Sequence, residues 1–134
     1  MTQEEKDLLI KDLCARLPYS VQCCAKNNHK ISGRLVGIIG ENVHVFSSGH
    51  GVFSINIIKP YLFPLSSMTD EEEEEYNILR DDVQTYHYEF GDVVDDVELC
   101  DNWESIDYLN AHHFDFRGLI EKELAIDATG LNIY

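Results

Sequence analysis

Acidic residues are concentrated in the second half of the chain, and this uneven charge constrains the fold more than any other feature. Residues 66–134 contain twenty Asp or Glu against three Lys or Arg, whereas residues 1–65 contain five against seven. Because like charges repel one another in a compact chain, the two halves are expected to present different surfaces. We predict a single domain over 1–134, near-neutral at 1–65 and acidic at 66–134.

The near-neutral half begins with the signals of one helix, followed by those of short strands. Thr2 and Glu5 have capping-box spacing and apolar residues follow at helical intervals, which predicts a helix over 3–16. From Tyr19 onward, apolar residues alternate with polar ones between Gly and Asn turn signals. Four strands are therefore expected, at 19–26, 30–39, 43–46 and 52–58. Such short strands, joined by tight turns, predict an antiparallel meander that curls into a small SH3-like half-barrel.

Two prolines follow the fourth predicted strand. Pro60 lacks a backbone N–H and is expected to close the meander, since proline cannot donate to a strand ladder. Between Pro60 and Pro64, the segment Tyr61–Leu65 is expected to be an extended apolar crossing rather than a helix or a central strand.

The acidic half begins with a second capping box and continues with a predicted hairpin. Thr69 and Glu72 precede a run of glutamates that suits the positive end of a helix dipole, so a helix is predicted over 70–80. The runs 83–90 and 93–99 are rich in Val, Tyr and Phe and flank Gly91-Asp92, which is typical of a hairpin.

Two short helices are predicted near the C-terminus. Asp101 or Asn102 is expected to cap the first, and Asp115 to cap the second. The tail at 129–134 is expected either to pair with an edge strand or to fray. The predicted fold class is therefore α+β, with an N-terminal helix and β-meander followed by acidic helices and a hairpin.

Three stretches of the sequence resemble a known family. They are Lys11–Tyr19, Lys59–Thr69 and Leu109–Lys122, and the family comprises small acidic proteins of gut anaerobes and their phages or mobile elements, with no function attached. The resemblance implies a shared fold and an intracellular mobile-element setting, and it implies no catalytic residue. Family members often have glycine where this chain has Glu123, so the resemblance does not carry a tight helix C-terminus to that position.

Charge and hydropathy exclude several classes of function. A formal charge of −15 repels the phosphates of nucleic acids and of membrane surfaces. No apolar run approaches the roughly 20 residues of a membrane helix, and the first ten residues are acidic, unlike a signal peptide. The four cysteines form no C-x-x-C pair, which is typical of buried thiols in a reducing compartment. We therefore predict a cytoplasmic protein that binds neither nucleic acid nor membrane directly.

The sequence contains no specific catalytic or metal-binding motif. His112 and His113 with Cys23, Cys24 or Cys100 offer zinc-type ligands, but adjacent helical residues point about 100° apart. G-x-S-x-G and phosphate-loop patterns are missing, and Asp92–Glu104 lacks the ligand order of an EF-hand. We expect no catalytic residue, no metal and no cofactor, and hence no enzyme. The alternative, a small metal-dependent or thiol enzyme using the scattered His and Cys residues, stays open.

The acidic residues then suggest a binding role. Carboxylates can imitate DNA phosphates and attract the basic groove of a nucleic-acid-binding protein, whereas the alternative is a solvated, solubilising face. We predict a non-enzymatic interaction module that regulates or inhibits a basic protein partner. The sequence does not indicate its oligomeric state. The predicted binding residues are Tyr61 and Phe63 in an apolar groove and the acids Glu71, Glu72, Glu75, Asp92, Asp95, Asp96 and Glu98.

Overall fold

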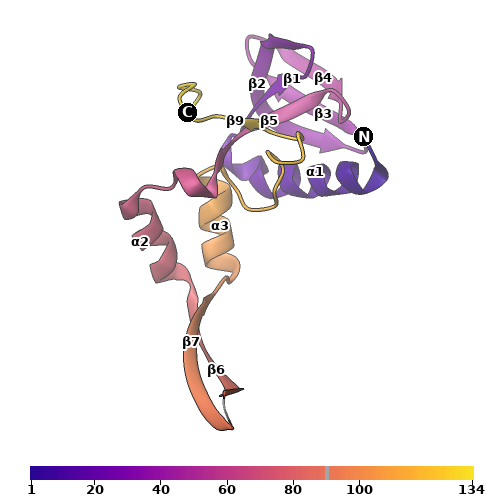
Figure 1. The fold of residues 1–134 in the computed structure, drawn as a ribbon. Helices are drawn as coiled ribbons and strands as arrows, with labels where there is room; N and C mark the ends of the chain where they lie inside the picture. The colour runs from indigo at the N-terminus through magenta and orange to yellow at the C-terminus, as the bar shows by residue number, and fades with distance from the viewer. Residues whose placement is uncertain (90) are drawn as a thin grey trace. The chain divides into compact units, whose positions relative to one another are not determined.

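The chain forms two compact units (Figure 1). We describe the computed structural model of residues 1–134 apart from Phe90, and without the side chains of His29, Asp92 and residues 84–89 and 94–96. Unit 1 comprises Met1–Ser67 and Asn110–Tyr134, and unit 2 comprises Met68–Leu109. The acidic half predicted from residue 66 onward is therefore shared between the units, because its last 25 residues fold with the N-terminal part.

Unit 1 consists of one helix and a sheet. Its elements are α1 (Gln3–Arg16), β1 (Gln22–Ala25), β2 (Asn28–Ile39), β3 (Asn42–Phe46), β4 (His50–Ser54), β5 (Ile58–Pro64), β8 (Phe114–Asp115) and β9 (Ile126–Asp127), with 3-10 turns at Leu17–Tyr19 and Leu65–Ser67. The predicted helix and its capping box are confirmed, since Thr2 Oγ1 accepts from Glu5 N and Glu5 accepts from Thr2 N. The first strand begins later than predicted, because the 3-10 turn ends in Ser20 with φ of 56°.

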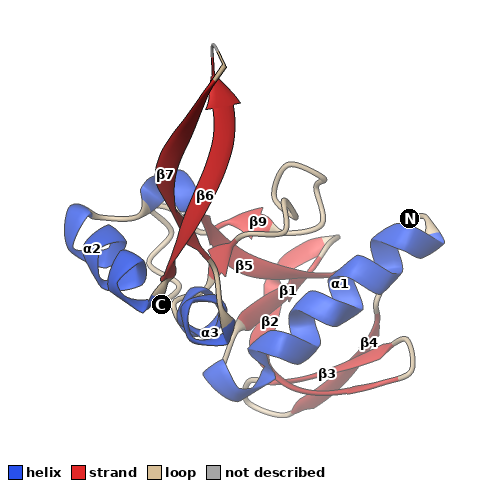
Figure 2. Cartoon of the chain, turned by 90° about the horizontal axis from the view of Figure 1, so that it is seen from below, coloured by secondary structure: helices blue, strands red, loops and turns tan. Residues whose placement is uncertain are grey.

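The sheet follows the order β4-β3-β2-β1-β5-β8, and β9 pairs with β5 as well. The first four strands form the predicted antiparallel meander, and β5 returns beside β1. Figure 2 shows α1 lying across this sheet. The α+β class and the helix preceding the strands are thus confirmed. The core between helix and sheet comprises Leu9, Leu13, Val21, Cys23, Leu35, Val43, Val45, Ile55, Ile58, Leu62, Leu119, Leu124 and Ala125.

The predicted crossing at Tyr61–Leu65 is wrong, because residues 61–64 continue a strand and Leu65 begins a 3-10 turn. The strand predicted at 52–58 ends at Ser54, and Ile58–Pro64 forms β5, with neighbours on both sides. Proline is tolerated here because Pro60 makes the last pair with β1, and Pro64 is the last residue of the strand. Beyond Pro60, parallel pairing with β9 and β8 completes the strand, and both partners come from the far end of the chain.

The helix predicted after Asp115 is also wrong, and Asp115, at the end of β8, holds a turn instead of capping a helix. Its carboxylate accepts from the backbone N–H groups of Leu119 and Ile120 at 3.0 and 2.9 Å. The turn that follows is brief because Gly118 has φ of 74° and Glu123 has φ of 61°. Leu124 N donates to Leu119 O and Glu123 N to Ile120 O, which is the hydrogen-bond pattern of a Schellman turn. A tight turn therefore forms at Glu123 without glycine.

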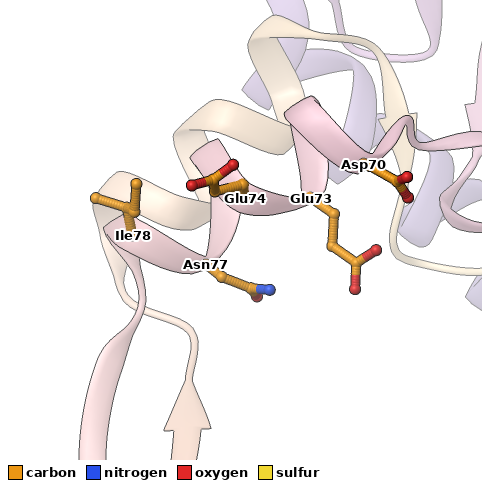
Figure 3. A pocket seen from close by; sticks show the side chains of 5 residues that line it. All are labelled: Asp70, Glu73, Glu74, Asn77 and Ile78. Carbon is orange, nitrogen blue, oxygen red and sulfur yellow. The ribbon is translucent and has the colours of Figure 1, made fainter.

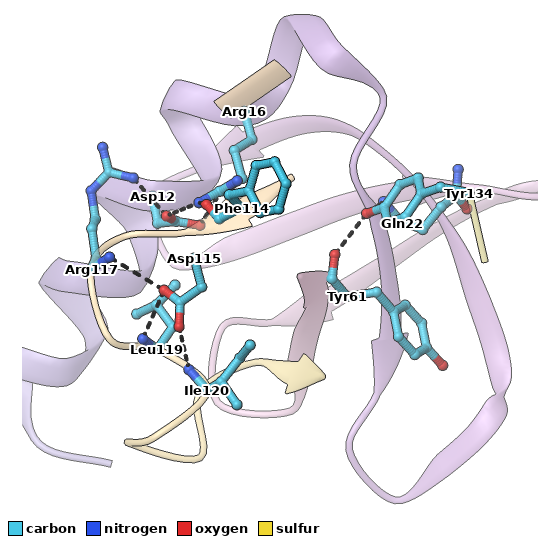
Figure 4. Close-up of polar contacts among 10 residues, drawn as sticks. All are labelled: Asp12, Arg16, Gln22, Tyr61, Phe114, Asp115, Arg117, Leu119, Ile120 and Tyr134. Atoms are coloured by element: carbon cyan, nitrogen blue, oxygen red, sulfur yellow. Dashed lines mark hydrogen bonds and ion pairs between the residues drawn. The ribbon is translucent and has the colours of Figure 1, made fainter. Parts of the chain in front are cut away.

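The C-terminal tail at 129–134 contains no strand and is held instead by its last side chain. Tyr134 Oη donates to Tyr61 O at 2.8 Å and accepts from Gln22 N at 2.9 Å (Figure 4). The tail is thereby attached to β5 and β1.

A buried ion pair joins α1 to the C-terminal segment of unit 1. Asp12 and Arg16 are fully buried, and Arg16 donates twice to the Asp12 carboxylate, at 2.8 and 3.0 Å (Figure 4). Arg16 also donates to Phe114 O at 2.6 Å, and Arg117 donates to Asp12 Oδ1 at 2.6 Å. One carboxylate thus connects the helix to residues about one hundred positions away.

Unit 2 contains α2 (Asp70–Leu79), β6 (Asp81–Glu89), β7 (Asp92–Cys100) and most of α3 (Trp103–Ala111). The predicted helix with its Thr69 capping box, the hairpin and the first of the two late helices are confirmed. Phe90, the last residue of the predicted strand 83–90, lies outside the described residues. Gly91 takes φ of 86° in the hairpin turn. Among the described residues, no helix is both long and apolar enough to cross a membrane.

We predict that Asp12→Ala lowers the free energy of unfolding by about 3–5 kcal/mol, because it leaves Arg16 buried without its carboxylate. Urea denaturation followed by circular dichroism measures this loss. Asp7→Ala, at an exposed position of the same helix, should change stability by less than about 0.5 kcal/mol. Replacing both partners, as Asp12→Leu with Arg16→Met, should recover part of the loss. Equal effects of Asp7→Ala and Asp12→Ala would contradict the role of the ion pair.

We further predict that Glu123→Gly raises the free energy of unfolding by about 1 kcal/mol, because glycine adopts the left-handed conformation without the Cβ penalty. Glu121→Gly is the matched control, since its φ is not positive, and it should lose about 0.5–1 kcal/mol. The same urea titration compares the two variants. A loss of stability in Glu123→Gly would show that the turn is not strained.

Candidate binding surface

The whole net charge of the chain belongs to unit 2. Its 42 residues hold sixteen of the 25 acids and one of the ten bases, so its formal charge is −15. The nine acids and nine bases of unit 1 cancel. Unit 2 is therefore the part of the molecule that attracts cations and repels anions.

One face of α2 carries a stripe of acidic side chains. Asp70, Glu73, Glu74, Asn77 and Ile78 have the spacing i, i+3, i+4, i+7 and i+8, which places them along one side of the helix (Figure 3). They line an open surface pocket of about 500 Å³. Acids are favourable at this helix N-terminus because they complement its dipole. The stripe ends in Ile78, whose side chain is 75% exposed.

A second cavity lies where α2 ends and β6 and α3 begin. Its volume is about 360 Å³, and its lining includes Ile78, Arg80, Asp81, Asn102, Trp103 and Glu104. Trp103 is 78% exposed, so this cavity is bordered by two large apolar side chains that face solvent. Asn102 fixes its base, since Oδ1 accepts from Ser105 N at 2.9 Å and Nδ2 donates to Leu79 O at 2.7 Å.

Arg80 is the only base of unit 2 and is held among its neighbours. It donates to Leu99 O at 2.6 Å and lies 3.5 Å from the Asp101 carboxylate and over the Tyr76 ring. Tyr76 donates to the same carboxylate, and burial, together with this hydrogen bond, raises the pKa of Tyr76 to about 12. Arg80 thus joins the end of α2 to the hairpin and to the residue that precedes the α3 cap.

Tyr108 makes a second connection between α3 and α2. Its hydroxyl donates to Glu75 Oε2 at 2.9 Å. Burial, and then the Glu75 carboxylate, raise the pKa of Tyr108. Glu75 is therefore engaged within the unit.

The hairpin also presents apolar side chains to solvent. Val93, Val97 and Leu99 alternate along β7 and so share one side of the ribbon, with 57%, 63% and 39% of their surfaces exposed. Glu98 projects from the other side and is exposed. Exposed apolar groups and carboxylates thus occur together in this unit.

The predicted binding residues lie in different environments. Glu71 and Glu98 are exposed, whereas Glu72 accepts from Thr69 N in the capping box. Tyr61 is 5% exposed in the core of unit 1, and Phe63 is half-buried beside the rings of Phe114 and Tyr134. The side chains of Asp92, Asp95 and Asp96 lie outside the described residues. The sequence did not single out Trp103 or Ile78 for binding, because helical spacing groups Trp103 with the apolar residues Ile106 and Leu109 and does not show that Trp103 is exposed.

The cysteines proposed as alternative nucleophiles are mostly inaccessible. Cys23 and Cys24 are buried, and burial raises the pKa of Cys23. A buried, protonated thiol is a poor nucleophile. Among the residues that the structure describes, no three His, Cys, Asp or Glu side chains form a group able to hold a metal ion.

The histidines show one pairing that the sequence did not predict. His44 Nδ1 and His50 Nε2, six positions apart in the chain, lie 2.7 Å from one another on neighbouring strands. His113 stacks on the Tyr134 ring with 3.8 Å between ring centres. Burial, and then the charges of Arg16 and His112, lower the pKa of His113 to about 4.

No family model, curated protein or solved structure matches this chain. The resemblance to small proteins of gut anaerobes and their phages therefore stays a prediction.

We predict that His113 makes stability depend on pH. Its pKa is about 4 in the folded chain and 6.5 when unperturbed, so between these values the unfolded chain binds a proton that the folded chain excludes. The free energy of unfolding should therefore rise with pH across this window. Urea titrations from pH 4 to pH 7 should give a smaller slope for His113→Asn than for the wild type, and His112→Asn, which removes only the smallest of the three causes, should change the slope less. An unchanged slope in His113→Asn would contradict the assignment.

Proposed function

We propose that this protein is a non-enzymatic interaction module whose unit 2 binds a basic protein partner. The observation that carries the proposal is the confinement of the formal charge of −15 to 42 residues, while unit 1 is neutral. Charge gathered in one unit produces a directional field that steers a basic partner toward that unit. A solubilising role would be served equally well by acids spread over both units.

Exposed apolar groups support binding rather than solubility alone. Trp103 and Ile78 are each about three-quarters exposed in unit 2, and Val97 is 63% exposed. Aromatic and large apolar side chains at the surface lower solubility but supply the binding energy of protein interfaces. Steering charges and apolar anchors in the same unit are what a docking surface requires.

The expected partner carries a basic groove, as nucleic-acid-binding proteins do. Carboxylates on α2 and the hairpin would occupy the positions of backbone phosphates, and the protein would act as a competitor of nucleic acid. The alternative of a small thiol enzyme has less support, because Cys23 and Cys24 are buried and the pKa of Cys23 is raised.

We predict that capture of the partner depends on charge in unit 2. The tagged protein should retain a basic protein from a lysate of a gut anaerobe, the setting that the family resemblance implies, at about 0.05 M salt and lose it at about 0.5 M, because added salt shortens the range of surface charges. Mass spectrometry measures the retained protein. The variant Glu71→Gln, Glu74→Gln, Glu98→Gln should retain much less of it, because three exposed carboxylates are lost from unit 2.

The matched control is Glu4→Gln, Glu121→Gln, Glu123→Gln, which removes three exposed carboxylates from unit 1 and should leave capture unchanged. Duplex DNA added to the complex should release the partner if both occupy one groove. If both variants retained equally little of the partner, or if the wild type still retained it at high salt, the proposal would be contradicted.

A further inference from the structure

The cavity of about 360 Å³ in unit 2 is lined mainly by polar groups, two carboxylates among them. Ile78, at the end of α2, and Trp103, at the start of α3, border it and face solvent. The indole and the isoleucine side chain provide flat and aliphatic surfaces for a long side chain to pack against. Ile78 is 75% exposed and Trp103 is 78% exposed, so an incoming side chain gains contact with both without displacing a neighbour.

Two acidic residues set the charge that this cavity accepts. Asp81 and Glu104 line it and are exposed. Arg80 also lines it, but its guanidinium already donates to Leu99 O and lies 3.5 Å from the Asp101 carboxylate. Arg80, the one Lys or Arg of unit 2, is thus paired with Asp101, and this unit has no second Lys or Arg to pair with Asp81 and Glu104.

Cationic side chains fit both features. Arginine is planar, stacks on indole faces and donates in pairs to carboxylates, whereas lysine presents a compact and strongly hydrated charge. An anionic or neutral occupant would meet two carboxylates in a unit of charge −15. Charge complementarity therefore favours a cationic side chain, and stacking on the indole favours the planar guanidinium of arginine over the ammonium of lysine.

We propose that this cavity binds an arginine side chain from an exposed segment of the basic partner, packed between Trp103 and Ile78 and paired with Asp81 and Glu104. This inference rests on the proposed function and adds its anchor point: the acidic stripe of α2 steers the partner, and the Trp103 cavity fixes its position. Interfaces commonly derive most of their binding energy from such a desolvated aromatic position.

Trp103 is the only tryptophan of the chain, so its fluorescence reports on this cavity alone. The full-length protein is titrated with acetylated, amidated hexa-arginine, and with hexalysine and a neutral Gly-Ser hexapeptide for comparison. Hexa-arginine should change the Trp103 emission with a saturable curve and bind more tightly than hexalysine, and the neutral peptide should have no effect. Calorimetry measures total binding in parallel.

Matched charge pairs locate the site. Asp81→Asn with Glu104→Gln should weaken hexa-arginine binding about tenfold, whereas Glu71→Gln with Glu98→Gln removes equal charge elsewhere in unit 2 and should weaken it about twofold. Trp103→Leu, followed by calorimetry, should erase the preference for arginine over lysine. Circular dichroism of each variant verifies folding.

The possible outcomes distinguish the proposed arginine site from the proposed function of unit 2. Calorimetric binding without a change in Trp103 emission, or equal weakening by the two charge pairs, would contradict arginine binding in this cavity. The proposal that unit 2 binds a basic partner would be unaffected. A response to the neutral peptide would overturn the selection for a cation. Failure of hexa-arginine to bind at low salt by calorimetry would count against both proposals.

Discussion

Unit 1 depends on a carboxylate buried inside it. Asp12 accepts hydrogen bonds from Arg16 and Arg117, and Arg16 in turn holds the carbonyl of Phe114. Removing Asp12 would leave Arg16 as an unpaired charge in the interior, so this ion pair couples the stability of the first helix to that of the last segment of the chain. These contacts also favour the pairing of β8 and β9 with β5, because both strands belong to the C-terminal segment that Asp12 and Arg16 hold.

Closure of unit 1 by both chain ends leaves residues 68–109 as a unit of their own. Sixteen acids gather in that unit, whereas the buried carboxylate of Asp12 belongs to unit 1. The local cost is self-repulsion, which Arg80 reduces by pairing with Asp101 and holding Leu99 O, and which the capping box of α2 reduces by placing carboxylates at a positive helix end. Charges that do not help to hold the unit together, such as Glu71 and Glu98, are the ones available to a partner.

Local signals predicted local structure well. Both capping boxes begin the helices that they predict, and Gly91 turns the predicted hairpin, because each signal acts within a few residues. The errors involve distant partners. Tyr61, predicted to lie in an extended crossing, is a strand residue paired with Ile126, and the helix expected after Asp115 is reduced to a turn by two left-handed residues. Among the binding residues, exposure separates Glu71 from Tyr61, and exposure is a tertiary property.

Residue type and spacing within one turn or strand were enough to predict the α+β class, the positions of the main helices and hairpin, and the acidity of the second half. Long-range contacts, by contrast, determine that the C-terminal 25 residues join the first unit, that Tyr61 lies in the core and that Trp103 borders a cavity. The physical reason is that burial and strand pairing are fixed by contacts between residues up to about one hundred positions apart, such as Arg16 with Phe114, and no local pattern encodes such a contact.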